Sequence, residues 1–310
     1  DDAYLDPAVD AVGFLTDELW TGYGVGGSLG PGLGRAYYAA PAEDRADLDA
    51  PRRDLTVFAG GNALAADALL AVTAYTDDER AREYADRILD GLERDLIDAD
   101  SGEVTHYRGS DGAGESDLLE DAARVVGAYV RAAGVRGEGI DVARAVADRA
   151  VDRLRVDGSF VDGPRSGPGL LDRSFRPLDA NVEMATSLLD LAAFTGEERY
   201  REVARETAEA FAGATDRLGV QVAGYGSLVG RLRRGTTVIA VGTDPGSDLH
   251  RAAWRVADHE KVIVPNADDA GGSLPRPVPS DTAVVLAGDD ASDPAETPDE
   301  LMDRVGELVS

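Results

Sequence analysis

The sequence predicts a mainly α-helical protein, in which an α/α toroid is followed by a small C-terminal α/β subdomain. Three observations predict this fold class. Helical hairpins repeat along the chain, each hairpin combines two kinds of helix, and strand-like segments replace the hairpins near the C-terminus. We place the toroid at residues 1–220 and the α/β subdomain at residues 221–310.

The repeat is clearest between residues 62–92 and 181–211, which align without gaps. Identical pairs in this alignment include Leu69 with Leu188, Leu70 with Leu189, Thr76 with Thr195, Glu79 with Glu198 and Arg80 with Arg199. The segment EDAARVVGAYVRAAGV lies halfway between the two copies and supplies a third unit of about 60 residues. Repeats of 20 to 50 residues or somewhat more are typical of stacked supersecondary units.

Each unit contains an apolar helix, a short turn and a more charged helix. The first helices carry Ala, Leu and Val on most faces, which suits an inner layer buried on both sides. The second helices place Arg and Glu three and four residues apart, which suits an outer, solvated layer. One more helix, PAVDAVGFLTDELW, precedes the first full unit, and a long Gly-rich loop follows it. Two concentric layers of helices are therefore expected.

The C-terminal region has a different pattern. TTVIAVG and KVIVPN are strand-like, and SDLHRAAWRVADH between them is helical. TAVVLAG predicts a third strand, and PDELMDRVGELV predicts a final helix. A strand, a helix and a second strand within one sheet imply a right-handed crossover in a small α/β unit.

The net charge of the chain limits the classes of partner that it is expected to bind. The chain has 59 acidic and 31 basic residues and a formal net charge of -28. This field repels phosphate backbones and anionic lipid, so we expect neither nucleic acid nor a membrane as partner. The chain also lacks the run of about 18 apolar residues that spans a bilayer.

Lys261 is the single lysine, and abundant carboxylate with little lysine is typical of surfaces that work in molar salt, where charge repulsion is screened. The alternative is a mesophilic acidic protein, which normally keeps its lysines.

Cysteine is absent and only three histidines are present. Disulfides, thiolate metal sites and cysteine nucleophiles are thereby excluded, and a histidine-rich metal site is not expected. We expect no cofactor, and a cytoplasmic location is consistent with this composition. The N-terminus has no initiating Met and no secretory pattern, which suggests part of a longer chain.

Three polar residues, Asn62, Asp121 and Asn181, occupy corresponding places near the starts of successive inner helices. Asn and Asp favour the N-cap, where the side chain accepts a bond from a free helix N–H that is worth roughly 1 kcal/mol. The alternative interpretation is a ring of polar groups over aligned helix dipoles, which suits hydroxyl groups or a bound anion.

Loops that enter the same rim add further candidates for substrate binding, namely Trp20, His106, Arg108 and Arg173. Aromatic faces beside amide, carboxylate and guanidinium groups suit a sugar or another polyol. The same residues could simply pack the loops.

Acidic residues at the rim are the candidates for catalysis. These are Glu120, Asp121 and Glu183. Paired carboxylates can act as general acid and general base, and their separation decides which chemistry is open to them.

The order of these segments resembles the C-terminal region of the thioredoxin-domain-containing family typified by spermatogenesis-associated protein 20, a family of unknown function. The similar segments are DLTVFAGGNALAADALL, SGEVTHYRG with LLEDAARVVGAYV, LDANVEMATSLLDLAAFTGEERYREVA and TTVIAVGTDPGSDLHRAAW. They cover nearly the whole chain, and they retain the family positions at Asn62, Arg108, Glu120, Asp121 and Asn181.

The resemblance implies a haloarchaeal member with a six-hairpin, glycosidase-like toroid similar to N-acylglucosamine 2-epimerase. The chain departs from the family where Leu286 and Ala291 stand at two cysteine positions, and the thioredoxin-like part is absent from this sequence. None of the three histidines lies on a predicted inner helix, where epimerases of this fold are expected to use paired histidines.

Two functions remain open at the level of sequence. The first is binding of, or action on, a sugar or similar polar metabolite in the central funnel. The second is a non-catalytic scaffold that docks a thioredoxin-like domain or another protein. About three full hairpins and one partial hairpin are visible, so the ring is either completed by other helices or open.

Overall fold

The structure is a computed structural model that describes residues 4–29, 34–49, 51–109, 112–164, 174–213, 223–268, 274 and 276–309. Most of these residues are helical. The helices are α1 (Leu5–Gly13), η2 (Phe14–Glu18), α2 (Gly34–Ala39), η3 (Ala42–Asp47), α3 (Ala59–Thr76), α4 (Glu79–Asp95), α5 (Leu119–Arg136), α6 (Ile140–Leu154), α7 (Leu178–Thr195), α8 (Glu198–Ala210), α10 (Ala223–Arg234), α11 (Asp248–Arg255) and α12 (Pro298–Val309).

The strands are short outside the C-terminal region. They are β1 (Ser28–Leu29), β2 (Arg53–Asp54), β3 (Val57–Phe58), β4 (Ile97–Asp98), β5 (Glu103–Val104), β6 (Tyr107–Gly109), β7 (Gly112–Ala113), β8 (Arg155–Val156), β9 (Ser159–Phe160), β10 (Thr237–Val241), β11 (Val262–Val264), β12 (Ala283–Ala287) and β13 (Asp290–Ala291). Within the described ranges, no helix is long and apolar enough to cross a membrane.

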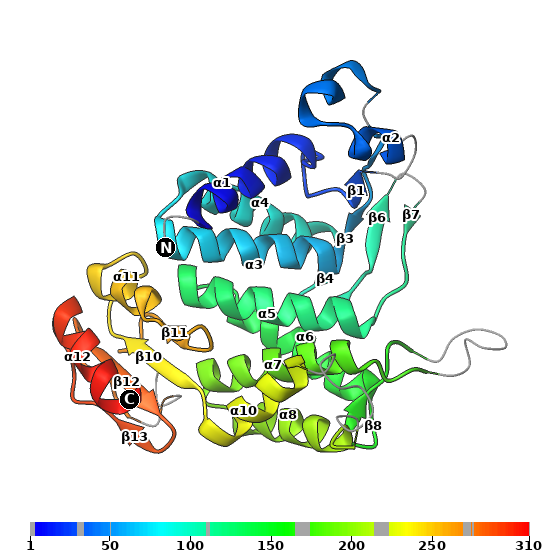
Figure 1. The fold of residues 1–310 in the computed structure, drawn as a ribbon. Helices are drawn as coiled ribbons and strands as arrows, with labels where there is room; N and C mark the ends of the chain where they lie inside the picture. The colour runs from blue at the N-terminus through cyan, green and yellow to red at the C-terminus, as the bar shows by residue number, and fades with distance from the viewer. Residues whose placement is uncertain are drawn as a thin grey trace.

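Helices α3, α5 and α7 lie side by side and form the inner layer of the toroid (Figure 1). Helices α4, α6 and α8 each pack against the inner helix that precedes them in the chain. Of the 18 residues of α5, 12 are buried, whereas 4 of the 13 residues of α8 are buried. The predicted division into inner and outer helices is therefore confirmed.

The hairpin turn is the same in the first and third units, as the sequence repeat predicts. Thr76 and Thr195 each donate their hydroxyl to the carbonyl four residues earlier in the inner helix. The next residue adopts the left-handed conformation in both turns, with φ of 58° at Asp77 and 72° at Gly196. Glycine and, less often, Asp supply this conformation at helix C-termini.

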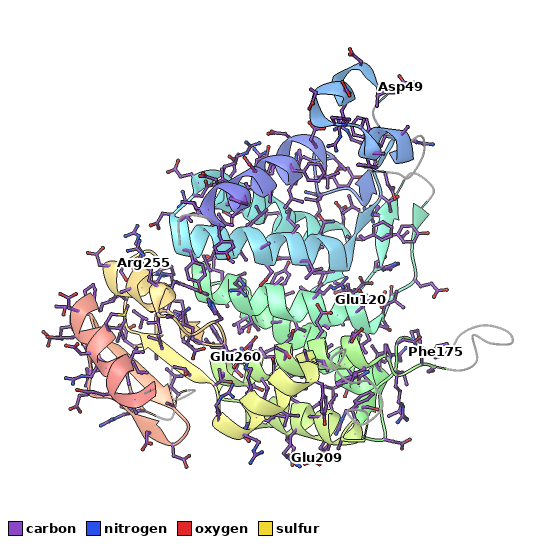
Figure 2. All side chains as sticks on the ribbon, in the orientation of Figure 1. Asp49, Glu120, Phe175, Glu209, Arg255 and Glu260 are labelled. Atoms are coloured by element: carbon purple, nitrogen blue, oxygen red, sulfur yellow. The ribbon has the colours of Figure 1, made fainter. Side chains whose placement is uncertain are left out.

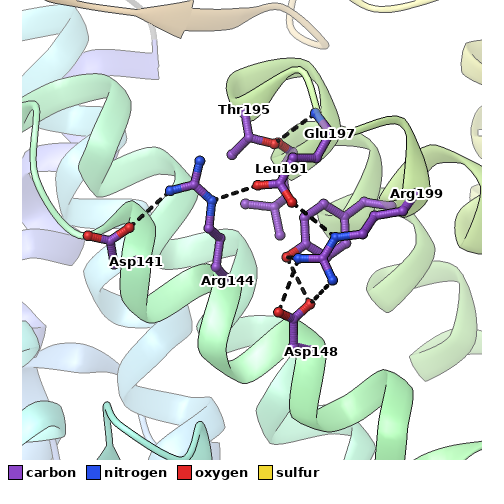
Figure 3. Close-up of polar contacts among 8 residues, drawn as sticks. Asp141, Arg144, Asp148, Leu191, Thr195, Glu197 and Arg199 are labelled. Carbon is purple, nitrogen blue, oxygen red and sulfur yellow. Dashed lines mark hydrogen bonds and ion pairs between the residues drawn. The ribbon is translucent and has the colours of Figure 1, made fainter. Parts of the chain in front are cut away.

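Ion pairs join the third hairpin to its neighbour (Figure 3). Glu197, in the α7–α8 turn, accepts from Arg144 of α6 at 2.7 Å and from Arg199 at 3.0 Å. Arg199 also pairs with Asp148 of α6 at 2.9 Å. Because these contacts link successive hairpins on the outer side, they help to fix the spacing between repeats.

A mixed four-stranded sheet with the order β11-β10-β12-β13 follows α10. Strands β10 and β11 are parallel and are joined through α11, while β12 is antiparallel to β10. Alternate residues of β10 face two separate apolar clusters, so that Ile239 contacts the side with α11 and α12, and Val238 the other side. The expected strand–helix–strand unit, third strand and final helix are confirmed, whereas the division of the chain at residue 220 stays a prediction.

The α/β region packs against the C-terminal ends of the inner helices (Figure 1). Helix α11 contacts α3, and strand β11 contacts α5 and α7. His250 of α11 is buried, and its Nε2 lies 2.8 Å from the carbonyl oxygen of Gly134 in α5. Its Nδ1 accepts from the backbone N–H of Gly246 at 3.0 Å. These two partners assign a neutral ring with its proton on Nε2, so Nε2 cannot also accept from the indole of Trp254 at 3.2 Å.

His250 makes this contact sensitive to acid. Burial lowers the pKa of His250 below its ordinary value near 6.5. The unfolded chain then binds the proton first as pH falls, so stability is lost below about pH 6.5. We expect the melting temperature of the protein to fall between pH 7 and pH 5 more steeply than that of His250→Gln. His259→Gln is the matched control because its side chain is exposed, and equal pH slopes for the protein and His250→Gln would contradict the assignment.

Candidate functional site

A cleft of about 570 Å³ opens at the N-terminal ends of α5 and α7. Glu120, labelled in Figure 2, marks its place at the start of α5. Its polar and charged lining residues are His106, Glu120, Asp121, Arg124, Asp162, Asp179 and Glu183. The three residues predicted as catalytic candidates, together with His106, therefore share one cleft.

Asp121 is held at both carboxylate oxygens. Its side chain is buried, with 3% of the residue exposed. Oδ1 accepts from the backbone N–H of Gly60 in α3 at 2.9 Å, and Oδ2 lies 2.7 Å from Nδ1 of His106. A Cβ atom at residue 60 would lie 2.7 Å from Oδ1, so a larger residue there would displace the Asp121 carboxylate. The geometry orients the half-exposed imidazole of His106 toward the cleft.

Arg124 joins the other two candidate carboxylates. It pairs with Glu120 one helical turn earlier, and its Nε donates to Oε1 of Glu183 across the α5–α7 contact at 3.3 Å. Glu120 is more exposed than Glu183, whose side chain is 34% exposed. Arg124 thus fixes a carboxylate from each of the two inner helices at the cleft.

Two of these carboxyl groups hold their protons more tightly than ordinary acids. Burial raises the pKa of Asp121, against the opposing effects of His106 and the Gly60 N–H. Burial likewise raises the pKa of Glu183, against the opposing effect of Arg124. Raised carboxyl pKa values in a cleft are typical of groups that exchange protons near neutral pH.

The balance of charge limits what the cleft can bind. Five carboxylates line it against one guanidinium and one imidazole. The N-terminal dipoles of α5 and α7 offset only part of this negative charge. The lining therefore suits a ligand that presents hydroxyl groups and carries no negative charge. In the part of the chain that the structure describes, no group of three or more acidic or His side chains is arranged to hold a metal ion.

Asn62 and Asn181 have a different position from Asp121. Both lie four residues after the N-cap of their helix, whereas Asp121 lies three residues after Leu118. The side-chain amide of Asn181 bonds the N–H and the carbonyl of Phe160 at 2.7 and 2.9 Å, and Asn62 bonds the same two groups of Val25. Neither residue lines the cleft, and neither shows the N-capping bond that the sequence predicts. They hold the preceding segment against the inner helix.

The remaining candidates for substrate binding lie elsewhere. Trp20 packs edge-on against Tyr84 of α4, with ring centroids 4.9 Å apart. Arg108 pairs with Asp95 at the end of α4 at 2.7 Å. Neither of them lines the cleft, and Arg173 lies outside the described residues.

Sequence reasoning missed the polar stripe to which Arg124 belongs. On α5 the stripe contains Glu120, Arg124 and Arg131, and charged residues recur 59 positions later on α7 as Asp179, Glu183 and Asp190. Intervals of four and seven residues place each set on one helix face. Charged residues at matched positions of two otherwise apolar helices were the signal that could have identified it.

The fold is the α/α toroid of six-hairpin, glycosidase-like proteins, as solved structures show. Cellobiose 2-epimerase from Spirochaeta thermophila superposes with a TM-score of 0.55 at 18% identity, covering 71% of this chain and 55% of that chain. D-mannose isomerase superposes with a TM-score of 0.51 at 14% identity, and the match covers 71% of this chain and 53% of the isomerase. Unsaturated glucuronyl hydrolase from Bacillus sp. GL1 superposes with a TM-score of 0.51 at 16% identity, and the match covers 68% of this chain and 56% of the hydrolase.

The chain spans about half the length of each of these structures. At such identities the likeness shows the fold alone. No protein-family model matches the sequence, and no curated protein matches it.

We expect Asn181→Ala to reduce stability strongly. Asn181 is fully buried, and its loss would leave the N–H and carbonyl of Phe160 without these partners. Each buried polar group left without a partner costs about 1 to 3 kcal/mol, so we expect a loss of about 3 kcal/mol in urea unfolding. A comparable loss in Asn62→Ala would show that the two repeats use the same device. A loss below about 1 kcal/mol in both variants would contradict this structural role.

We expect Glu183→Gln to raise the melting temperature at neutral pH. Since the pKa of Glu183 is raised in the folded state, the native protein loses stability as pH rises above the ordinary carboxyl value of 4.5. The variant avoids this loss, and its advantage should disappear near pH 4. Glu198→Gln, an exposed position on α8, is the control. A lower melting temperature for Glu183→Gln at every pH would mean that the contact with Arg124 outweighs the burial of the carboxylate.

Proposed function

We propose that the acidic cleft binds a sugar or a similar polar metabolite and performs acid–base chemistry on it. One observation carries the proposal. The Asp121–His106 pair and the Arg124–Glu183 pair converge on one cleft of about 570 Å³.

His106 is the proposed proton carrier. The Asp121 carboxylate fixes the imidazole by holding Nδ1, as buried carboxylates do in other acid–base sites, and Nε2 remains to exchange a proton with the ligand. Glu183 is the proposed second acid–base group, because it lines the cleft beside Arg124 and burial raises its pKa above the ordinary carboxyl value. Asp121 is thus a positioning residue in this proposal.

The structural neighbours support a sugar as the substrate class. A cellobiose 2-epimerase, a D-mannose isomerase and an unsaturated glucuronyl hydrolase share the toroid fold. The excess of carboxylates in the cleft favours a neutral sugar over an anionic one. The sequence motifs further support membership in the thioredoxin-domain-containing family and a cellular environment rich in salt.

A second candidate function is docking of a thioredoxin-like domain or another protein. Leu64 and Tyr75 of α3 support it, because 45% and 41% of their surfaces are exposed on one inner helix. Eleven residues, about three helical turns, separate Leu64 from Tyr75, so both lie on one face of α3, and a partner that covers this face would remove apolar surface from water.

The two functions are separated by titrating a panel of neutral mono- and disaccharides in high salt and following the melting temperature and any isomerised product. We expect a saturable rise in melting temperature. His106→Gln and Glu183→Gln should reduce turnover by a factor of about 10² to 10⁴, the usual contribution of general acid–base catalysis.

Asp141→Asn is the matched control, since it removes an exposed carboxylate of α6. An unmoved melting temperature across the whole panel would contradict the sugar-binding proposal. Capture of a thioredoxin-like domain that Leu64→Glu abolishes would then favour docking.

A further inference from the structure

A second cavity of about 260 Å³ lies where the α/β region meets the inner helices. It is lined by residues from α3, α5 and α7, from α10, α11 and β11, and by residues 259–261 just before β11. Glu260, labelled in Figure 2, marks this junction. The cavity shares no lining residue with the acidic cleft at the other end of the same helices.

The single lysine of the chain lines this cavity. Lys261 is buried, with 8% of the residue exposed. Its Nζ donates to the hydroxyl of Tyr75 and to the carbonyl of Asp258, both at 3.1 Å, and lies 5.3 and 5.6 Å from the rings of Tyr75 and Trp254. An ammonium group has three N–H donors, and both acceptors here are neutral. No carboxylate of the described residues lies within 4.0 Å of Nζ, the limit for an ion pair.

Arg231 is a second buried cation at the cavity, with 4% of the residue exposed. One terminal nitrogen contacts Asp190 at 2.5 Å and Thr236 at 3.1 Å. Its Nε is buried and finds no acceptor among the described residues. Buried guanidinium nitrogens normally have partners, so an acceptor from outside the chain would satisfy this group.

Positive charge is in excess here, in contrast to the rest of the chain. Three cations, Arg131, Arg231 and Lys261, line the cavity together with two carboxylates, Asp190 and Glu260. Asp190 pairs with Arg231, and Arg131 pairs with Asp67, which is not a lining residue. The carboxylate of Glu260 pairs with Arg234. Three cations thus face two carboxylates in a protein whose formal net charge is -28. A buried charge without a counter-charge is costly, so an anion would stabilise the cavity.

We propose that this cavity binds a sugar-sized organic anion, whose carboxylate or phosphate group contacts Lys261 and Arg231 and whose C–H groups pack on Trp254. The volume is below the usual range of about 300 to 1,000 Å³ for sites of drug-sized ligands, which favours a small molecule. The inference does not depend on the function proposed for the acidic cleft.

The single lysine allows a direct test. Biosynthetic labelling of lysine with ¹³C at Cε gives one lysine resonance, that of Lys261. Glucuronate, glucose 6-phosphate and glucose are titrated separately into the labelled protein, with chloride keeping the ionic strength constant. We expect a saturable shift with glucuronate, with glucose 6-phosphate or with both, and no shift with glucose. The two anions distinguish a carboxylate ligand from a phosphate ligand.

Calorimetric titration of variants with the same three probes shows which residues contribute to anion binding. Lys261→Gln should weaken binding of the anion at least tenfold, as expected when a hydrogen bond to a charged group is lost. Glu183→Gln should leave anion binding unchanged, because Glu183 lines the acidic cleft and not this cavity.

Three results would overturn the proposal. These are the absence of a saturable shift with either anion, equal affinity in Lys261→Gln, and loss of anion binding in Glu183→Gln. The titration of the unsubstituted protein gives its answer even if Lys261→Gln fails to fold. Failure of the neutral sugars to bind would concern only the acidic cleft, so the two proposals fail separately.

Discussion

The close packing of α3, α5 and α7 is the constraint on which the rest of the structure depends. Small residues on these helices favour close approach, and Ala63, Ala123 and Ala185 are fully buried. A parallel inner layer then places all three helix N-termini at one end and all three C-termini at the other. Each candidate site lies toward one end of this layer, where charged residues of the inner helices line a cleft or a cavity.

The two ends differ in charge because different segments cover them. At the N-terminal end, the carboxylates of α5 and α7 face a cleft, with Arg124 between Glu120 and Glu183. At the C-terminal end the α/β region adds Arg231 and Lys261 and buries them against the inner helices. Charges removed from water interact more strongly than surface charges, so the two ends differ in their local electrostatics.

The repeat also shows how one structural device is reused and then changed. Asn62 and Asn181 hold the preceding backbone segment in the same way, through paired amide bonds to Val25 and Phe160. In the central unit, the corresponding polar residue is Asp121, one residue nearer to the helix start. That shift rotates it by about 100° around the helix axis, toward Gly60 and His106. In the central unit, the polar residue near the helix start therefore lines the cleft, whereas in the other two units it holds a backbone segment.

The sequence by itself determined the hairpin repeat, the inner and outer helices and the order of strands and helices in the α/β region, because apolar periodicity and turn residues are local properties. It also indicated Glu120, Asp121, Glu183 and His106. Only the tertiary structure decided that these four residues share a cleft, that Asn62, Asn181, Trp20 and Arg108 face other partners, and that Lys261 lines a cavity. Which residues lie together depends on how each helix is rotated about its axis and on where distant segments pack. Neither of these produces a periodic pattern in a single sequence.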